Sequence, residues 1–363
     1  MRPLPEFPWA SLQPYRERAT AFPDGLIDLS IGTPVDPTPK LVRDALADAA
    51  DAPGYPATGG TAALREAVTA YFARRWGIAD VDPDGVLPVI GSKEFVASLP
   101  TMLGLGEGDA VVFPELAYPT YDIGARLAGA ESVRADSVVA LGPSSPGLVW
   151  LNSPRNPDGK VLPPEHMAKV ITWARERGTV VAADECYLEF GWRTRPVSVL
   201  DPQVNGGSLD GVLAVHSLSK RSNLAGYRAG FVAGDGALVR RLVEFRKHAG
   251  MIVPAPTQAA MIEALADDTH VEEQRDRYAA RRASLWATLE EAGFRIDGSE
   301  GGLYLWATRN ERCWDTVGWL ADRGVLVAPG SFYGPSGAQH VRIALTVSDE
   351  DIATAANRIL APE

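Results

Sequence analysis

Six short apolar runs between residues 86 and 233 constrain the fold of this chain more than any other feature of its sequence. They are Val86 to Ile90, Ala110 to Phe113, Leu148 to Asn152, Val180 to Asp184, Val212 to Ser217 and Gly230 to Ala233. Most are apolar throughout, which is typical of strands that are covered on both faces. Helical periodicity occurs before and between them, at Thr61 to Trp76 and Pro164 to Arg177. The pattern predicts an α/β fold with a mostly parallel sheet between helices.

The C-terminal third has a different pattern. We expect a long charged helix near Val271 to Ala292, then Gly302 to Trp306, a helix near Trp314 to Arg323 and two short strands, which together indicate an α+β lobe. Arg281 and Arg282 lie among acidic residues, so we expect them on a solvated helix face. The predicted organisation is an N-terminal segment (residues 1–35) packing with the small domain, a large cofactor-binding domain (36–245) and a C-terminal small domain (246–363).

Composition excludes several classes of partner. The 363 residues carry a formal net charge of -11, so we expect no nucleic-acid partner and no anionic membrane partner. The two cysteines, Cys186 and Cys313, are too few for a disulfide framework and lack metal-ligand spacing, so we expect no metal site. The proline-rich N-terminus has no apolar run suited to a signal peptide or a membrane span. These features favour a cytoplasmic protein.

The strongest local motif is Ser217-Leu-Ser-Lys220, which ends an apolar run and is followed by Gly226-Tyr-Arg228. Burial beside other cations lowers the pKa of a lysine amine, and the neutral amine is the form that attacks an aldehyde cofactor. Arg228 and the hydroxyls of Ser217 and Ser219 would then hold a phosphate. Taken alone, a lysine at a strand end is more often a surface side chain with its stem along an apolar patch.

Two further motifs follow neighbouring apolar runs. Asp184 ends one run and Tyr187 comes three positions later, so the acid can keep a pyridine nitrogen protonated while the phenol bonds the ring oxygen. Asn156, within Asn152-Ser-Pro-Arg-Asn-Pro-Asp-Gly159, offers an amide to the same oxygen. The alternatives are a helix cap or metal ligand for Asp184 and a simple Asn-Pro turn for Asn156.

Three weaker signals complete the set. Ile90-Gly-Ser92-Lys93 predicts a tight turn into a helix, whose first N–H groups bind anions. Tyr118 is able to stack on a pyridine ring, although a loop tyrosine more often serves packing. Arg342 lies in an apolar strand, and a buried guanidinium requires an anionic partner such as a substrate α-carboxylate.

In this order the motifs resemble those of the fold-type I pyridoxal-phosphate aminotransferases, from Leu29-Ser-Ile-Gly32 to Val341-Arg342. The resemblance implies a seven-stranded, mostly parallel sheet in the large domain and pyridoxal 5'-phosphate as cofactor. It implies that Lys220 binds the cofactor covalently, that Asp184 pairs with the ring nitrogen and that Tyr187 bonds the ring oxygen. It also implies that Tyr118 stacks on the ring and that Asn156 bonds the ring oxygen. The residues implied in phosphate binding are Ser92, Lys93, Ser217, Ser219 and Arg228. Those implied in substrate binding are Arg342, Gly32 and Asn156.

The resemblance also implies a homodimer, because Tyr55 matches a tyrosine that reaches the phosphate of the neighbouring subunit. One departure occurs: the family usually has Asn-Pro-Thr-Gly, whereas here Asp158 replaces the threonine and Arg155 precedes Asn156.

Within the family, several stretches are similar to actinobacterial succinyldiaminopimelate transaminases, among them Pro88-Val-Ile-Gly-Ser-Lys-Glu and Gly302-Leu-Tyr-Leu-Trp-Ala. This similarity implies transfer of an amino group from N-succinyl-LL-2,6-diaminopimelate to 2-oxoglutarate in lysine biosynthesis. A remote succinyl carboxylate needs its own cation, for which Arg155, Lys93 and Arg16 are the candidates.

Other functions stay open at this point. They are an aminotransferase with another amino donor (LL-diaminopimelate, aspartate or alanine type), a β-lyase or decarboxylase with the same cofactor, and a cofactor-sensing transcription regulator. Arg342 disfavours a decarboxylase, because it favours substrates that keep an α-carboxylate. The acidic chain shows no helix-turn-helix pattern in its first sixty residues, which disfavours the regulator.

Overall fold

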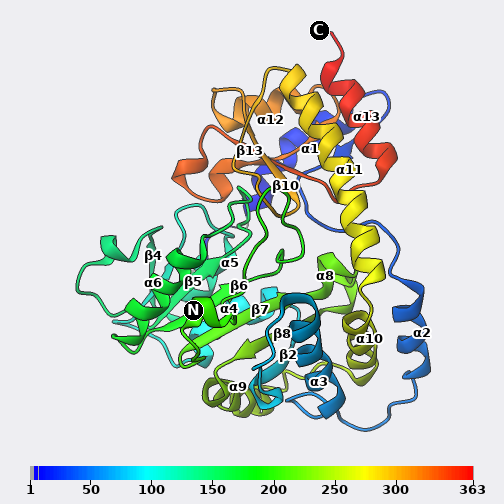
Figure 1. Ribbon diagram of the computed structural model, residues 1–363. Coiled ribbons are helices and arrows are strands. Elements are labelled where there is room, and N and C mark those ends of the chain that lie inside the picture. Colours follow the sequence, from blue (N-terminus) through cyan, green and yellow to red (C-terminus); the bar gives the residue numbers. More distant parts are fainter. Residues whose placement is uncertain (1–3, 7, 363) are drawn as a thin grey trace.

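A computed structural model describes residues 4–6 and 8–362 (Figure 1). Its centre is a seven-stranded sheet in the order β2 (Val86–Ile90), β8 (Ala229–Gly234), β7 (Val212–Ser217), β6 (Val180–Asp184), β5 (Leu148–Asn152), β3 (Ala110–Phe113) and β4 (Glu131–Arg134). Only β8 runs in the opposite direction to the other six strands of this sheet. The predicted α/β class with a mostly parallel seven-stranded sheet is therefore confirmed.

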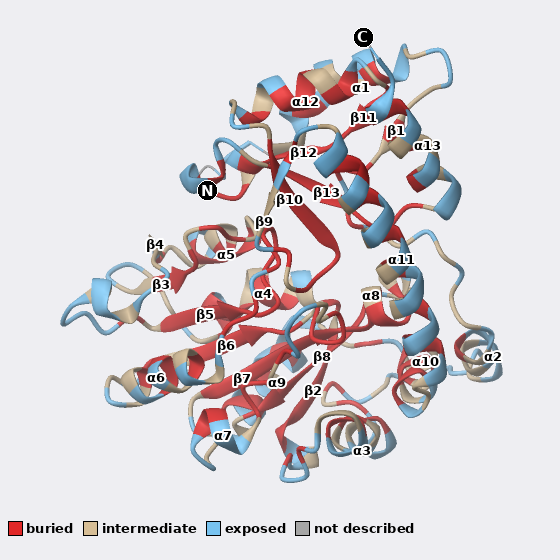
Figure 2. Ribbon diagram, turned by 45° about the horizontal axis from the view of Figure 1, so that its top comes forward, coloured by how far each residue is buried: buried red, intermediate tan, exposed pale blue. Residues whose placement is uncertain are grey.

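Helices cover both faces of this sheet. One face packs against α3 (Ala62–Tyr71), α6 (Pro164–Arg175), α7 (Pro202–Asn205) and α10 (Ala255–Ala266), and α2 (Lys40–Asp48) lies on α10. The other face packs against α4 (Ser92–Met102), α5 (Thr120–Ala128) and α9 (Gly236–Ala249). Successive residues of β5 alternate between the two cores, with Val149 in one and Trp150 in the other. The strands other than the edge strand β4 are consequently buried on both sides (Figure 2).

Local sequence determines where several helices begin and end. The side chain of Thr61 accepts a hydrogen bond from the Leu64 backbone N–H at the start of α3, and Asp235 does the same for Ala237 and Leu238 in α9. Gly129 and Gly250 end α5 and α9 in the left-handed conformation, which glycine adopts without steric cost.

The C-terminal residues build a second core beside the sheet. It contains the antiparallel strands β12 (Ala328–Pro329), β13 (Val341–Ala344), β10 (Tyr304–Thr308) and β9 (Arg295–Asp297), with helices α12 (Cys313–Ala321) and α13 (Asp349–Leu360). The long helix α11 (Thr269–Glu291) runs from beside α8 (Leu218–Arg221) and α10 to α13 (Figure 1). The second core thus lies next to the edge of the sheet where the parallel strands end.

The N-terminal elements pack on this second core. Helix α1 (Gln13–Thr20) lies against α12, where the Tyr15 and Trp314 ring centroids are 5.3 Å apart. Strand β1 (Ile27–Asp28) pairs in parallel with β11 (Val325–Leu326). The domain limits at residues 35/36 and 245/246 stay predictions.

Two expectations about helices need correction. The helix expected over Thr61 to Trp76 is α-helical only to Tyr71 and continues as a π-helical turn, η2 (Phe72–Trp76). Arg281 does not lie on a solvated face: its side chain is 3% exposed and forms ion pairs with Asp36 and Asp349, both at 2.6 Å. The reason is tertiary, because α11 packs against segments that carry carboxylates far away in the sequence.

Within the described residues, none of the helices combines the length and apolarity needed to cross a bilayer.

Candidate active site

The predicted functional side chains converge where β5, β6 and β7 end. The register aligns Asn152 with Asp184 and Asp184 with Val215, so the carboxyl ends of these parallel strands meet at one edge of the sheet. Asp184 is the last residue of β6, Asn156 follows β5 by four residues, and Lys220 follows β7 by three. Such an edge is where open α/β sheets form their ligand sites.

Lys220 lies on the short helix α8. The side chain of Ser217 caps this helix by accepting a hydrogen bond from the Ser219 backbone N–H at 3.1 Å. The Lys220 ammonium donates to the carbonyl oxygen of Gly32, which connects the N-terminal loop to the site. Burial lowers the pKa of Lys220, and the charges of Arg342 and Arg228 act in the same direction. Its neutral amine is therefore more accessible than that of an ordinary lysine.

Asp184 is buried, with 7% of its surface exposed. Its Oδ2 accepts a hydrogen bond from the Tyr121 hydroxyl at 2.8 Å, and its Oδ1 accepts one from the Cys186 backbone N–H at 3.2 Å. The Tyr121 ring stacks on Trp150 at 5.1 Å. Burial raises the pKa of Asp184 in spite of these donors. A cation placed beside this carboxylate would stabilise its charged form, as a protonated ring nitrogen does.

Arg342 on β13 is buried and has no carboxylate partner among residues 4–6 and 8–362. Its Nη1 donates to Asn156 Oδ1 at 3.0 Å and its Nη2 to the Ser30 carbonyl oxygen at 2.7 Å. The guanidinium lies over the Tyr304 ring, 3.9 Å from its centroid, and its Nε has no hydrogen-bond partner within this part of the chain. A buried, uncompensated guanidinium fits an anionic ligand.

The phenols near Arg342 form a connected group. The hydroxyls of Tyr187 and Tyr304 are 3.0 Å apart, and burial raises the pKa of Tyr187 well above its ordinary value. Gly32 lies directly under the Tyr304 hydroxyl, where a Cβ atom would collide with it. Tyr118 stands edge-on to Tyr121 at 6.0 Å between ring centroids, and burial raises its pKa to about 12. The hydroxyls of Tyr187 and Tyr118 are therefore neutral at physiological pH.

A second part of the site has features that favour anion binding. Helix α4 begins at Ser92, followed by Lys93, directly after Gly91, which has a φ of +77°. The Arg228 guanidinium packs against Gly91 so closely that a Cβ atom there would collide with it. Ser217 pairs with Gly230, and a Cβ atom at Gly230 would lie 3.3 Å from the Ser92 nitrogen. The start of α4, Arg228 and Ser217 are therefore neighbours, and the first N–H groups of a helix together with a guanidinium favour an anion.

Tyr55 is the predicted site residue that the single chain does not bring to this group. Its side chain is 99% exposed.

Sequence reasoning missed Tyr121 and Tyr304. Tyr121 follows Tyr118 by three residues, so both lie where the loop enters α5, and this spacing was the available signal. Tyr304 is a phenol inside an apolar strand that pairs with the strand of Arg342, which was the signal in its case.

The structure explains the departure at Asp158. Arg155 donates to both carboxylate oxygens of Asp158, at 2.8 and 2.5 Å, and to Asp136 at 3.0 Å. Arg155 and Asp158 therefore form a buried ion pair across the turn that contains Asn156.

The geometry fits pyridoxal 5'-phosphate. It combines a buried amine with a lowered pKa, a carboxylate on the neighbouring strand, an anion-binding corner and an uncompensated arginine. No group of three His, Cys, Asp or Glu side chains suited to a metal ion occurs in the part of the chain that the structure describes. The fold and the site define a fold-type I, pyridoxal-phosphate-dependent enzyme.

Comparison with known proteins identifies the family. Residues 24–359 match the model of the aminotransferases of class I and II, and the chain belongs to this family. The chain is 61% identical to a 4-dedimethylamino-4-oxo-anhydrotetracycline transaminase of Streptomyces rimosus, over 99% of this chain and 100% of that protein. It is also 61% identical to a probable aminotransferase of Mycobacterium tuberculosis, over 98% of this chain and 85% of that protein. It is therefore an aminotransferase with pyridoxal 5'-phosphate as cofactor.

Solved structures agree on the fold. An aminotransferase of Neisseria meningitidis superposes with a TM-score of 0.90 at 30% identity, over 98% of this chain and 97% of that chain. A probable N-succinyldiaminopimelate aminotransferase of Thermus thermophilus superposes with a TM-score of 0.87 at 28% identity, over 97% and 99%.

Proposed function

We propose that this enzyme moves an amino group between an α-amino acid and a 2-oxo acid, with Lys220 as the residue that binds the cofactor and carries the proton. The observation that carries the proposal is the Lys220 amine, whose pKa is lowered by burial and which lies beside Gly32, near Arg342 and Arg228. When bound, the cofactor supplies an electron sink that stabilises negative charge on the substrate Cα.

The chain's own groups divide the work of holding the cofactor. Asp184, which accepts a hydrogen bond from Tyr121, would keep the ring nitrogen protonated, while Tyr187 and Asn156 would donate to the ring oxygen and Tyr118 would pack on the ring. Ser92, the Lys93 backbone, Ser217, Ser219 and Arg228 would bind the phosphate of the cofactor.

Substrate binding and proton transfer follow from the same geometry. Arg342 binds the α-carboxylate with its planar fork, and Asn156 orients that fork through the hydrogen bond at 3.0 Å. Gly32 lies in the loop beside this carboxylate. The Lys220 Nζ would take the proton from the substrate Cα and later give a proton back, for which an amine of lowered pKa is suited.

The active form in this proposal is a homodimer. Tyr55 is a large aromatic side chain that is 99% exposed on the single chain, and Val35 and Ile31 in the preceding segment are 55% and 45% exposed. Burial of this apolar surface against a second subunit favours association. In the dimer Tyr55 reaches the phosphate in the neighbouring site.

For the amino donor, the comparisons favour an aminotransferase other than the succinyldiaminopimelate type. The two 61% identical relatives have names without this substrate, and an LL-diaminopimelate aminotransferase of Aquifex aeolicus is 32% identical over 99% of this chain and 97% of that protein. We propose an amino donor without the succinyl group, of the LL-diaminopimelate, aspartate or alanine type.

The succinylated donor is the second candidate, supported by the structural likeness to the Thermus protein. The contacts weaken it, because Arg155 and Arg16, which were considered for the succinyl carboxylate, have acidic partners. Arg155 is paired with Asp158 and Asp136, and Arg16 is paired with Asp28 at 2.5 Å. Lys93 is exposed at the first turn of α4.

A donor panel tests the proposal. The purified enzyme is mixed with each donor in turn and 2-oxoglutarate, and glutamate formation is measured for LL-diaminopimelate, N-succinyl-LL-diaminopimelate, L-aspartate and L-alanine. Separately, L-glutamate alone should convert the cofactor from its aldehyde to its amine form, seen as a change in visible absorbance. Release of ammonia in place of this conversion would contradict the aminotransferase mechanism and favour a β-lyase.

A further inference from the structure

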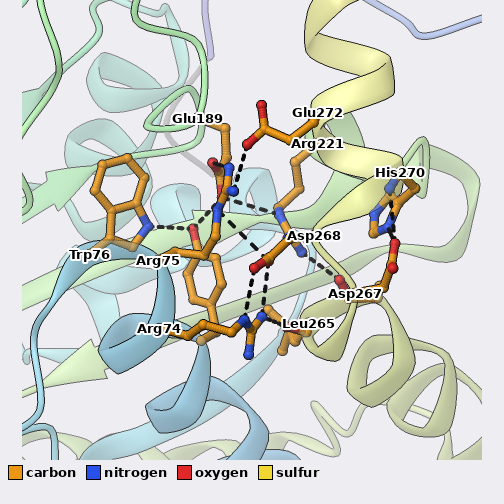
Figure 3. A network of polar contacts seen from close by, with 12 residues as sticks. Arg74, Arg75, Trp76, Glu189, Arg221, Leu265, Asp267, Asp268, His270 and Glu272 are labelled. Atoms are coloured by element: carbon orange, nitrogen blue, oxygen red, sulfur yellow. Dashed lines mark hydrogen bonds and ion pairs between the residues drawn. The ribbon is translucent and has the colours of Figure 1, made fainter.

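A pocket of about 430 Å³ lies apart from the residues assigned to the cofactor and the substrate. Three segments form it: Arg75 and Trp76 in η2, residues 188–196 after β6, and Glu272 and Arg275 on α11. Figure 3 shows the polar contacts along one wall, where Arg75 lies between Glu189 and Glu272. The pocket therefore lies between η2, the segment that follows β6, and the long helix α11.

The pocket concentrates positive charge in an acidic protein. Four arginines line it, together with two carboxylates, although the whole chain carries a net charge of -11. Both carboxylates are already bound: Arg75 donates to Glu189 at 2.7 Å and to Glu272 at 2.6 Å. Glu189 also accepts a hydrogen bond from Tyr71 at 2.9 Å and lies 3.6 Å from Arg221. The charge of the other three arginines is thus not offset by acids of the wall.

These three arginines, Arg193, Arg195 and Arg275, contact aromatic rings instead of acids. Their guanidinium carbons lie 4.7 Å from the Trp286 centroid, 5.5 Å from Trp76 and 5.5 Å from Trp192, respectively. Within residues 4–6 and 8–362, none of the three forms an ion pair with a carboxylate. A cation–π contact holds a guanidinium in place and leaves most of its N–H donors available for a ligand.

The donors that the protein does use are few. Arg195 donates to the Arg75 carbonyl oxygen at 3.2 Å, and Arg275 donates to the Gly191 carbonyl oxygen at 2.9 Å. Arg282 contacts the same indole as Arg193, at 4.6 Å, and donates to the Ser299 carbonyl oxygen. Burial and then the charge of Arg193 lower the pKa of Arg282. An anion beside Arg193 would relieve this repulsion between like charges.

We propose that this pocket binds a small organic anion that carries two or more carboxylate or phosphate groups. Arginine forks bind both groups in bidentate fashion, and a bound ligand would bridge η2, the segment 188–196 and α11. The proposal is independent of the proposed function, because it involves none of the residues assigned to the cofactor or the substrate.

Calorimetric titration of the cofactor-loaded enzyme tests the proposal, with citrate as the carboxylate probe and pyrophosphate as the phosphate probe. We expect at least one probe to bind, and the one that binds defines the chemical class. The double variant Arg195→Gln/Arg275→Gln should weaken this binding at least about tenfold, since hydrogen bonds to charged groups contribute about 1.5–3 kcal/mol each. The second variant Arg193→Gln removes a side chain that lies over the Trp286 ring and forms no ion pair with a carboxylate among the described residues, and it should weaken binding without affecting folding.

The matched control is Arg295→Gln/Arg312→Gln, which removes two exposed positive charges elsewhere. It should leave the dissociation constant unchanged within about twofold, because exposed charges act weakly at a distance. Two results would overturn the proposal: neither probe binding below about 1 mM, or binding that the pocket variants leave as strong as in the wild type. The second result would mean that the measured heat comes from probe binding at the active site or from nonspecific electrostatic binding.

Discussion

Replacement of Arg342 by lysine separates a guanidinium that binds substrate from one that only stabilises the fold. The variant keeps the positive charge on β13 but loses the planar fork that contacts Asn156 and the Ser30 carbonyl oxygen. A lysine offers the α-carboxylate one charge-assisted hydrogen bond in place of two. One such bond contributes about 1.5–3 kcal/mol, so kcat/KM should fall about 10- to 150-fold for every amino donor.

The matched control is Arg358→Lys. Arg358 is also buried and also donates to backbone carbonyl oxygens, those of Gly25, Asp24 and Gly324, but it lies on α13 away from the strand ends. Its replacement should lower thermal stability and leave kcat/KM unchanged within about twofold. The assay is steady-state kinetics with L-glutamate, together with thermal melting of each variant. A folded Arg342→Lys enzyme with wild-type kcat/KM would refute the reasoning.

Three further predictions concern the cofactor and the dimer. Tyr121→Phe removes the hydroxyl that donates to Asp184 at 2.8 Å, so cofactor affinity should fall about tenfold in a fluorescence titration; unchanged affinity would remove Tyr121 from the site. In the cofactor-free protein, cofactor uptake by Lys220 should rise with pH and level off below the ordinary lysine pKa of about 10.4, measured by stopped-flow absorbance. The unfolded chain binds the Lys220 proton more tightly than the folded protein does. Thermal stability of the cofactor-free protein should therefore also rise with pH between the lowered pKa of Lys220 and its ordinary value, and a flat profile would contradict the lowered pKa. Mixing inactive Tyr55→Ala and Lys220→Ala subunits should restore activity through one intact shared site per mixed dimer, whereas no recovery would contradict the exchange of Tyr55.

Most of the fold was predicted from the apolar pattern of the strands. Six of the seven strands were predicted to within a residue at each end, because buried parallel strands are apolar on both faces. The seventh strand, Glu131–Arg134, was missed because it lies at the edge of the sheet, is only partly buried and contains charged residues.

The site was predicted only where local sequence carried a signal. Lys220, Asp184 and Asn156 follow apolar runs, so their convergence could be expected before the structure was known. Tyr121 and Tyr304 were missed because a buried aromatic residue is indistinguishable from core packing until its hydroxyl partner is known. The ion pair of Arg16 with Asp28 joins segments 12 residues apart, so the sequence could not reveal that this cation is already compensated. For Arg155 the nearby Asp158 was an available signal, and only the second partner, Asp136, lies 19 residues away.

The central claim of this account is that the Lys220 amine carries the cofactor. Borohydride reduction of the cofactor-loaded enzyme, followed by digestion and mass spectrometry, tests it most directly. The account predicts a stable phosphopyridoxyl label on the peptide that contains Ser217 to Lys220, and no label in the Lys220→Ala variant. A label on another lysine, or an unlabelled wild-type enzyme that still binds the cofactor, would contradict it.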